Sequence, residues 1–191
     1  MEIGLYFGSF NPIHIGHLII ASYARQTTAL QQVWLVVSPQ NPHKVSASLL
    51  NEYDRLYMVN LAIEDGGNDL KTSDVEFHLP KPSYTVHTLT YLTEKYPQHN
   101  FSIIMGSDSY TNLPKWKNYD HVLKNHKLYI FERPGYPIST TLSGRIEILK
   151  APLLEISSTQ IRAMIKKGLS VRYLVPEKPL REIENNRYYK N

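Results

Sequence analysis

Short apolar runs alternate along the chain with longer stretches of helical periodicity. The first run, Ile3 to Gly8, is apolar and ends at a glycine, which is typical of a buried parallel strand. Apolar residues then recur at helical spacing from Gly16 to Ala29. A β-rich run from Val33 to Ser38 is stopped by a polar stretch with two prolines, and helical periodicity returns from Glu52 to Glu64. The pattern predicts strand, helix, strand and helix in that order.

The same alternation continues through the rest of the chain. It predicts strands at residues 70–76, 101–106, 127–132 and 153–156, and helices at 84–95, 142–149, 159–167 and from 176 onward. Strands that alternate with helices imply right-handed crossovers and a parallel sheet. We therefore expect an α/β fold with a doubly wound, Rossmann-like parallel sheet, whose ligands bind where strand ends meet helix starts. We expect one domain over residues 1–191, with a small helical C-terminal part from about residue 157.

Composition excludes several classes of protein. The chain has 191 residues and no cysteine, which rules out disulfides, thiolate metal sites and a cysteine nucleophile. No apolar run approaches the roughly 20 residues of a membrane helix, and the N-terminus lacks the features of a secretory signal. The net charge of +4 is modest, and the basic, tyrosine-rich stretch from Arg172 to Lys190 is typical of a solvated face. We expect a cytoplasmic protein without a membrane or nucleic-acid partner, and leave open whether it forms a homo-oligomer.

The segment from Gly8 to His17 reads GSFNPIHIGH and joins the first predicted strand to the first predicted helix. Its glycine permits close approach of the backbone to a ligand, and a helix start offers free N–H groups and the positive end of a dipole. His14 and His17 are three residues apart, so both imidazoles can face the same end of the sheet and bind phosphate oxygens. Packing of the first helical turn is the alternative. A zinc site lacks a third ligand nearby, so we predict no metal held by the protein itself.

A second polar segment, Ile156 to Arg162, reads ISSTQIR at the start of another predicted helix. Ser157, Ser158 and Thr159 place hydroxyls and backbone donors there. Arg162 adds a permanent positive charge one turn later. Such a site suits the β- and γ-phosphates of ATP, and an ordinary helix cap is the alternative.

Together the two segments resemble the signatures of the nucleotidylyltransferase superfamily. The first carries the HxGH element at residues 14–17, and the second, about 140 residues later, matches the ISSTxxR signature. Within this superfamily the chain is similar to the bacterial nicotinate-mononucleotide adenylyltransferases over nearly its whole length. The further motifs of this likeness are NPHK (41–44), PSYTVHTL (82–89), MGSDS (105–109), LPKW (113–116) and RPGYP (133–137). They distinguish the chain from phosphopantetheine adenylyltransferases, which also carry the first two.

The resemblance implies transfer of AMP from ATP to nicotinate mononucleotide, which gives nicotinate adenine dinucleotide and pyrophosphate in NAD biosynthesis. The catalytic residues that it implies are His14, His17 and Lys44. The mononucleotide phosphate attacks the α-phosphorus in line and without a covalent intermediate, because a phosphate monoester is already ionised near neutral pH. Mg²⁺ is expected on the ATP phosphates rather than in a protein cage.

The resemblance also divides the binding residues between two substrates. Those implied on the mononucleotide side are Tyr84, Thr85, Trp116 and Arg133, and those implied around ATP are Gly8, Ser9, Phe10, Gly106, Asp108, Ile156, Ser157, Ser158, Thr159 and Arg162.

Three of these residues have a physical role that can be stated from their type and place. Asp108 follows a predicted strand and suits hydrogen bonds from ribose hydroxyls. Trp116 offers a flat face to a pyridine ring, and Thr85 at a helix start suits the pyridine carboxylate. The alternatives are helix caps for Asp108 and Thr85 and core packing for Trp116.

His87 bears on whether the enzyme prefers the acid mononucleotide, with nicotinate, or the amide, with nicotinamide. It occupies a position at which members of this family often have Asp or Gln. Contact of His87 with the substrate would affect that preference, whereas a solvent-facing His87 would not. The alternative functions are a sister enzyme that uses nicotinamide mononucleotide or phosphopantetheine, and a non-catalytic nucleotide- or RNA-binding module.

Overall fold

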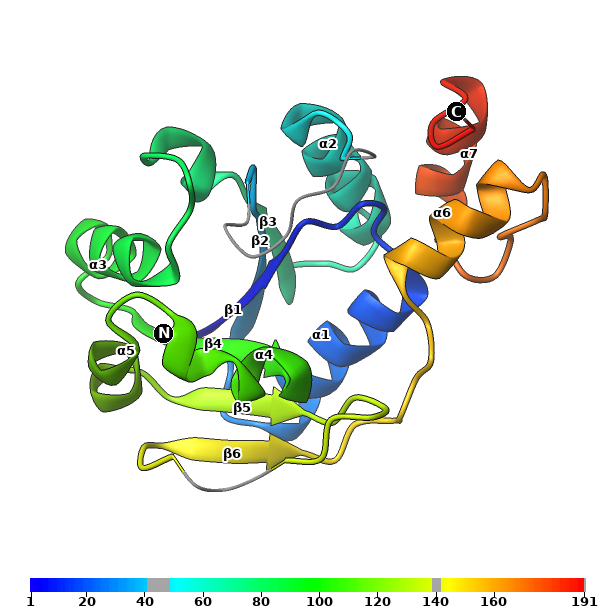
Figure 1. Cartoon of the computed structure of the whole chain (residues 1–191). Coiled ribbons are helices and arrows are strands. Elements are labelled where there is room, and N and C mark those ends of the chain that lie inside the picture. The colour runs from blue at the N-terminus through cyan, green and yellow to red at the C-terminus, as the bar shows by residue number, and fades with distance from the viewer. Residues whose placement is uncertain (41–48, 139–141, 191) are drawn as a thin grey trace.

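The structure is a computed structural model that describes residues 1–40, 49–138 and 142–190 (Figure 1). Its six parallel strands form one sheet in the order β3-β2-β1-β4-β5-β6. Their bounds are β1 Glu2–Gly8, β2 Gln32–Val37, β3 Leu70–Ser73, β4 Asn100–Gly106, β5 Leu128–Phe131 and β6 Ile146–Leu149. The strand order reverses between β1 and β4, so the predicted doubly wound parallel sheet is confirmed.

Helices cover both faces of this sheet (Figure 1). Four of them, α1, α2, α6 and α7, pack on one face, and α3 and α5 pack on the other. The bounds are α1 Ile15–Thr27, α2 Glu52–Ile63, α3 Thr85–Lys95, α4 Ser107–Thr111, α5 Tyr119–Asn125, α6 Ser158–Lys166 and α7 Glu177–Asn185. None of the helices in the described ranges combines the length and the apolar character that a bilayer crossing requires.

The two faces of the sheet carry separate apolar clusters because side chains alternate along a strand with a period of two. On β4, Ile103 and Met105 belong to the cluster with α3 and α5, whereas Ile104 belongs to the cluster with α1 and α2. All six residues of β2 are buried, as expected for a strand covered by helices on both sides.

Two predicted elements near residue 150 are wrong. The predicted helix at 142–149 is replaced by β6, which pairs with β5 at the edge of the sheet. Leu142, Ile146 and Leu149 have helical spacing, but Ile146 packs with one face of the sheet and Leu149 with the other, as strand residues three apart do. The predicted strand at 153–156 has no strand partner; this part of the chain leaves the sheet, and Leu153 is exposed.

Several short elements were not predicted. The strand predicted at 70–76 ends at Ser73, and Val75–His78 forms the 3-10 turn η1. Between β4 and β5 the chain forms α4, the 3-10 turn η2 (Leu113–Lys115) and α5. These elements have too few turns to show a clear helical period in the sequence.

Arg55 on α2 joins the loops at the carboxyl edge of the sheet. Arg55 is fully buried, and its guanidinium donates to four carbonyl groups. Nη1 donates to Ser9 O at 2.6 Å and to Ser38 O at 2.8 Å, in the loops after β1 and β2. Nη2 donates to Pro39 O at 3.2 Å and Nε to Leu50 O at 3.0 Å. One side chain therefore fixes the loops of β1 and β2 relative to α2.

Replacement of Arg55 by alanine is expected to lower the free energy of unfolding by about 3–5 kcal/mol, because it leaves four carbonyl groups without their donor. Urea unfolding followed by circular dichroism measures the change. Arg181→Ala is the matched control, since that side chain is 71% exposed and, among the described residues, forms an ion pair with Glu177 one turn away. Its expected cost is below about 1 kcal/mol. Equal costs for the two variants would contradict the role given to Arg55.

Candidate active site

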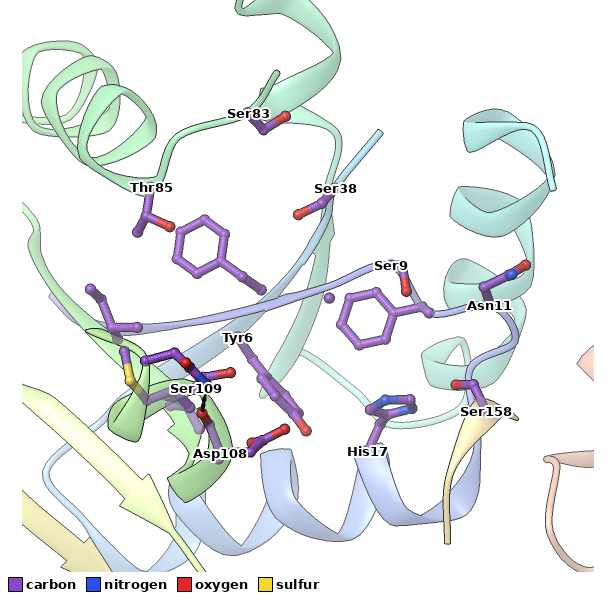
Figure 2. A pocket seen from close by; sticks show the side chains of 18 of the residues that line it. Tyr6, Ser9, Asn11, His17, Ser38, Ser83, Thr85, Asp108, Ser109 and Ser158 are labelled. Atoms are coloured by element: carbon purple, nitrogen blue, oxygen red, sulfur yellow. Dashed lines mark hydrogen bonds between the residues drawn. The ribbon is translucent and has the colours of Figure 1, made fainter. Parts of the chain in front are cut away.

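A cavity of about 860 Å³ opens at the carboxyl edge of the sheet, where β1 and β4 lead to helices on opposite faces. Doubly wound sheets bind their ligands at this point. Figure 2 shows Ser9, Asn11, His17 and Ser158 at one end, and Ser38, Ser83 and Thr85 at the other. We call these the histidine end and the α3 end.

All the predicted site residues but two belong to the wall of this cavity. Ile156 lies beside it, at a smaller hollow of about 340 Å³. Lys44 lies outside the described residues.

The loop after β1 turns sharply under the cavity. Phe10 adopts a left-handed conformation with φ of 44°, and its ring is almost completely buried. A Cβ atom on Gly8 would stand 2.9 Å from that ring, so only glycine fits there without displacing Phe10. The Phe10 ring also packs edge-on against His17, with ring centroids 5.0 Å apart. Gly8, Ser9 and Phe10 thereby bring their backbone to the histidine end.

The two histidines lie against each other at the start of α1. His14 is the N-cap residue, and the two rings are stacked with centroids 3.6 Å apart. The backbone N–H of His14 donates to Nδ1 of His17 at 3.2 Å. A ring nitrogen that accepts a hydrogen bond carries no proton, so the neutral His17 ring bears its proton on Nε2. His17 is thus held as a hydrogen-bond donor through Nε2.

Burial distinguishes His14 from His17. His14 is 5% exposed, and its Nδ1 has no hydrogen-bond partner among the described residues. Burial, followed by the charge of Arg133, lowers the pKa of His14 to about 4. His14 is therefore a neutral ring that packs and caps the first turn while lining the cavity. Within the described ranges, no three His, Asp or Glu side chains gather as a metal-binding cluster.

The ISSTQIR segment touches the loop after β1 directly. Ser157 caps α6 by accepting from Gln160 N at 3.2 Å. Ser158 Oγ donates to Pro12 O at 2.9 Å, and Arg162 Nη1 donates to Asn11 O at 2.8 Å. The segment therefore acts both as a helix cap and as one wall of the histidine end.

Thr159 completes this wall. Arg162 Nη2 lies 3.4 Å from Thr159 Oγ1, at the limit of a hydrogen bond. The side chain of Arg162 is thus oriented from two sides, by Asn11 and by Thr159.

Asp108 and Arg133, which the family resemblance assigns to different substrates, form an ion pair. Arg133 Nη1 lies 3.0 Å from Asp108 Oδ2. A Cβ atom on Gly106 would stand 2.5 Å from Asp108 Oδ1 and 2.7 Å from Arg133 Cδ, so the glycine leaves room for this pair. Asp108 Oδ1 is buried and has no hydrogen-bond partner in the described part of the chain. One oxygen of Asp108 holds Arg133, and the other is enclosed next to Gly106.

The α3 end combines a helix start with aromatic side chains. Tyr84 is the N-cap residue of α3 and Thr85 its first residue, as predicted for this segment. Trp116 is half-buried in the wall, and Lys117 Nζ lies 4.8 Å from the centroid of the Tyr84 ring. His87 packs edge-on against Tyr84 with centroids 5.6 Å apart and is absent from the described residues of the wall.

Several residues of the site were missed from the sequence. Asn11 Oδ1 accepts from Tyr189 Oη at 2.8 Å and from Leu50 N at 3.3 Å, so the C-terminal segment reaches the loop after β1. Glu76 and Ser38 also line the cavity. Ser38 directly follows a predicted strand, which is a usable signal, whereas nothing in the sequence indicates that Tyr189 returns to Asn11.

Comparison with known proteins identifies the family. Residues 5–164 match the family described as cytidylyltransferase-like. Two curated relatives, from Flavobacterium psychrophilum and Cytophaga hutchinsonii, are 48% and 49% identical to this chain. Each is named as a probable nicotinate-nucleotide adenylyltransferase, and each match covers 100% of this chain and 100% of the relative. The chain belongs to the nicotinate-nucleotide adenylyltransferase family. The resemblance found in its motifs is confirmed, and the chain is a nucleotidyltransferase.

The fold of this adenylyltransferase is shared by distant solved structures. The nicotinic acid mononucleotide adenylyltransferase of Plasmodium falciparum, solved in complex with NaAD, superposes with a TM-score of 0.84 at 20% identity. The match covers 98% of this chain and 97% of that one. At this identity the likeness establishes the fold.

The buried neutral His14 of this adenylyltransferase gives stability a specific pH dependence. Its folded pKa of about 4 lies below the ordinary 6.5, so between these values the unfolded chain binds a proton that the folded chain excludes. The free energy of unfolding is therefore expected to fall as the pH drops, by up to about 3 kcal/mol from this group. Urea unfolding between pH 7.5 and pH 4.5 measures the slope. His14→Asn should flatten it, and parallel curves for the two proteins would refute this account.

Proposed function

We propose that the chain transfers AMP from ATP to nicotinate mononucleotide and releases nicotinate adenine dinucleotide and pyrophosphate. The observation that carries this proposal is the direct joining of the two signature segments, in which Ser158 and Arg162 donate to the carbonyl groups of Pro12 and Asn11. The segments therefore line one cavity instead of two separate sites. Full-length likeness to relatives named for this reaction supports the choice of acceptor.

In this proposal the phosphates of ATP lie at the histidine end, against the backbone of residues 8–10 and the hydroxyls of residues 157–159. Asp108, in the wall of the cavity, accepts hydrogen bonds from the ribose. The pyridine ring stacks on Trp116 at the α3 end, with its carboxylate at the start of α3 near Tyr84 and Thr85. Arg133, paired with Asp108, lies between the two nucleotides.

The chemical step requires positioning and charge neutralisation. An oxygen of the ionised mononucleotide phosphate forms a bond to the α-phosphorus of ATP, and the bond from that phosphorus to the pyrophosphate oxygen breaks. His17 donates from Nε2 to the α-phosphate as charge shifts in the transition state. Arg162 and the hydroxyls at the start of α6 hold the departing pyrophosphate. Lys44 supplies an additional positive charge to the phosphates.

His14 takes a supporting part in this mechanism. Its neutral ring stacks on His17, and its backbone N–H fixes the His17 tautomer. Loss of the His14 ring therefore alters the orientation of His17 rather than the charge of the site.

The residues of the cavity fit a magnesium ion carried by ATP. Magnesium prefers oxygen ligands and keeps waters, and it is usually held by phosphates with one or two carboxylates. The hydroxyls at the start of α6 face the part of the cavity in which the ATP phosphates are proposed to bind, and they offer oxygen atoms beside those phosphates. When bound, the ion would neutralise phosphate charge.

We further propose that residues 1–191 work as a single domain in the cytoplasm, with the two nucleotides as its partners. Packing of α6 and α7 in one apolar cluster with α1 and α2 supports a single unit. The lack of cysteine suits a reducing compartment.

His17→Ala is expected to lower kcat by a factor of about 100 or more, because a transition-state donor is lost. A coupled pyrophosphate-release assay with ATP and nicotinate mononucleotide measures the effect. His121→Ala, at an exposed position of α5, is the control and should keep wild-type turnover. Turnover by a folded His17→Ala protein near the wild-type value would rule out this role.

Trp116→Ala is expected to raise KM for nicotinate mononucleotide by about 10-fold or more, since stacking of one ring contributes about 1–3 kcal/mol. KM for ATP should change by less than about 2-fold, and Trp116→Phe should restore most of the affinity. The same assay with nicotinamide mononucleotide and phosphopantetheine tests the sister activities. Faster pyrophosphate release with either of these than with nicotinate mononucleotide would reject the proposed acceptor.

A further inference from the structure

Glu76 is a buried carboxyl group at the α3 end that the proposed mechanism does not use. It lies in η1, is 2% exposed and forms part of the cavity wall. Thr88 Oγ1 donates to Glu76 Oε1 at 2.9 Å, and Thr88 is itself 1% exposed. Burial of a charged group without a partner costs free energy, so a carboxyl group at this depth must be compensated by its surroundings.

Glu76 lies near residues that precede and follow Tyr84, the N-cap residue of α3. Thr88 lies one turn into the helix, and Ser83 directly precedes Tyr84, the N-cap. Glu76 Oε2 and Ser83 Oγ are both buried without a hydrogen-bond partner among the described residues. Ser83 and Thr85 lie together at this end of the cavity (Figure 2). The carboxyl group of Glu76 thus supports the helix start at which the pyridine carboxylate is proposed to bind.

The surroundings of Glu76 favour its uncharged form. Burial raises the pKa of Glu76, and the nearby hydroxyls of Ser38, Thr88 and Ser83 oppose that rise in part. Among the described residues, Thr88 is the one whose hydroxyl reaches the carboxyl group with hydrogen-bond geometry. Within the described ranges, no Lys or Arg forms an ion pair with this carboxyl group. The first turn of α3 carries no acidic side chain either. An anion at this helix start therefore meets backbone donors and the positive end of the helix dipole.

We propose that Glu76 is a positioning residue that holds the start of α3 for an anionic pyridine carboxylate and so selects the acid mononucleotide over its amide. The inference rests on the proposed function, because it concerns the acceptor of the same reaction. Glu76 accepts from Thr88 and so keeps the helix start in place. Its raised pKa reduces the share of the ionised form, which would repel a second carboxylate. An ionised group at the same position would repel the acid and favour the uncharged amide.

The experiment compares kcat/KM for nicotinate mononucleotide and nicotinamide mononucleotide across four variants of the full chain. Glu76→Ala should raise KM for the acid and lower the acid-to-amide ratio by about 10-fold or more, because the helix start moves. Glu76→Gln, an uncharged group of the same shape, should stay within about 3-fold of the wild type. Thr88→Val removes the bond to Oε1 and should lower the ratio in the same direction. Glu94→Ala, at an exposed position of the same helix, is the matched control.

The ratio separates positioning from general destabilisation, because loss of folded protein lowers both activities equally. KM for ATP should stay within about 2-fold of wild type in every variant. An unchanged ratio in Glu76→Ala would overturn the inference, and so would a Glu76→Gln protein as impaired as Glu76→Ala, since that requires the ionised form. If Glu76→Ala does not fold, an unchanged ratio in Thr88→Val overturns it instead. Either of these outcomes would overturn the role of Glu76 alone, because the wild-type protein would still use the acid mononucleotide. A wild-type protein that prefers the amide would contradict the proposed function as well.

Discussion

The guanidinium of Arg55 donates to carbonyl groups in the loop after β1, in the loop after β2 and just before α2. Its charge is compensated by carbonyl dipoles, with no carboxylate among these four bonds. The arrangement fixes Ser9, next to the left-handed Phe10, and Ser38, at the α3 end. Both ends of the cavity therefore depend on one buried cation. A parallel sheet supplies strand ends that point in one direction, but it does not by itself hold the loops that follow them at a constant separation.

Three helix starts share the cavity that these loops enclose. His14 begins α1, Tyr84 begins α3 and Ser157 begins α6, and all three residues line the wall. Each start offers backbone donors and the positive end of a helix dipole, which suits a substrate pair rich in phosphate and carboxylate. The wall also carries charged side chains, which are those of Arg133, Arg162, Lys115, Lys117, Asp108 and Glu76. Recognition by oriented dipoles needs little rearrangement as charge moves during the reaction.

Much of this arrangement could be predicted from the sequence, and the failures have physical causes. Apolar runs that end at glycine located β1 and β4, and the two polar segments at helix starts indicated a shared phosphate site. The edge strand β6 was missed because Leu149 is its one buried residue and Ile148 is exposed, which leaves a pattern that a helix also produces. Arg55 and Glu76 were missed for a different reason. Charged residues are normally exposed, and the groups that compensate for their burial come from segments that only the folded chain brings together.

The hydrogen bond from Tyr189 to Asn11 connects residues 178 positions apart. A ribosome makes the loop after β1 well before it makes Tyr189. At about 5–20 residues per second, roughly 10–40 s separate the two events. During that interval Asn11 lacks the tyrosine hydroxyl, and the loop at the histidine end is incomplete. The strands of the sheet can therefore pair before the loop at the histidine end reaches its final order, because that order depends on a residue made after every strand.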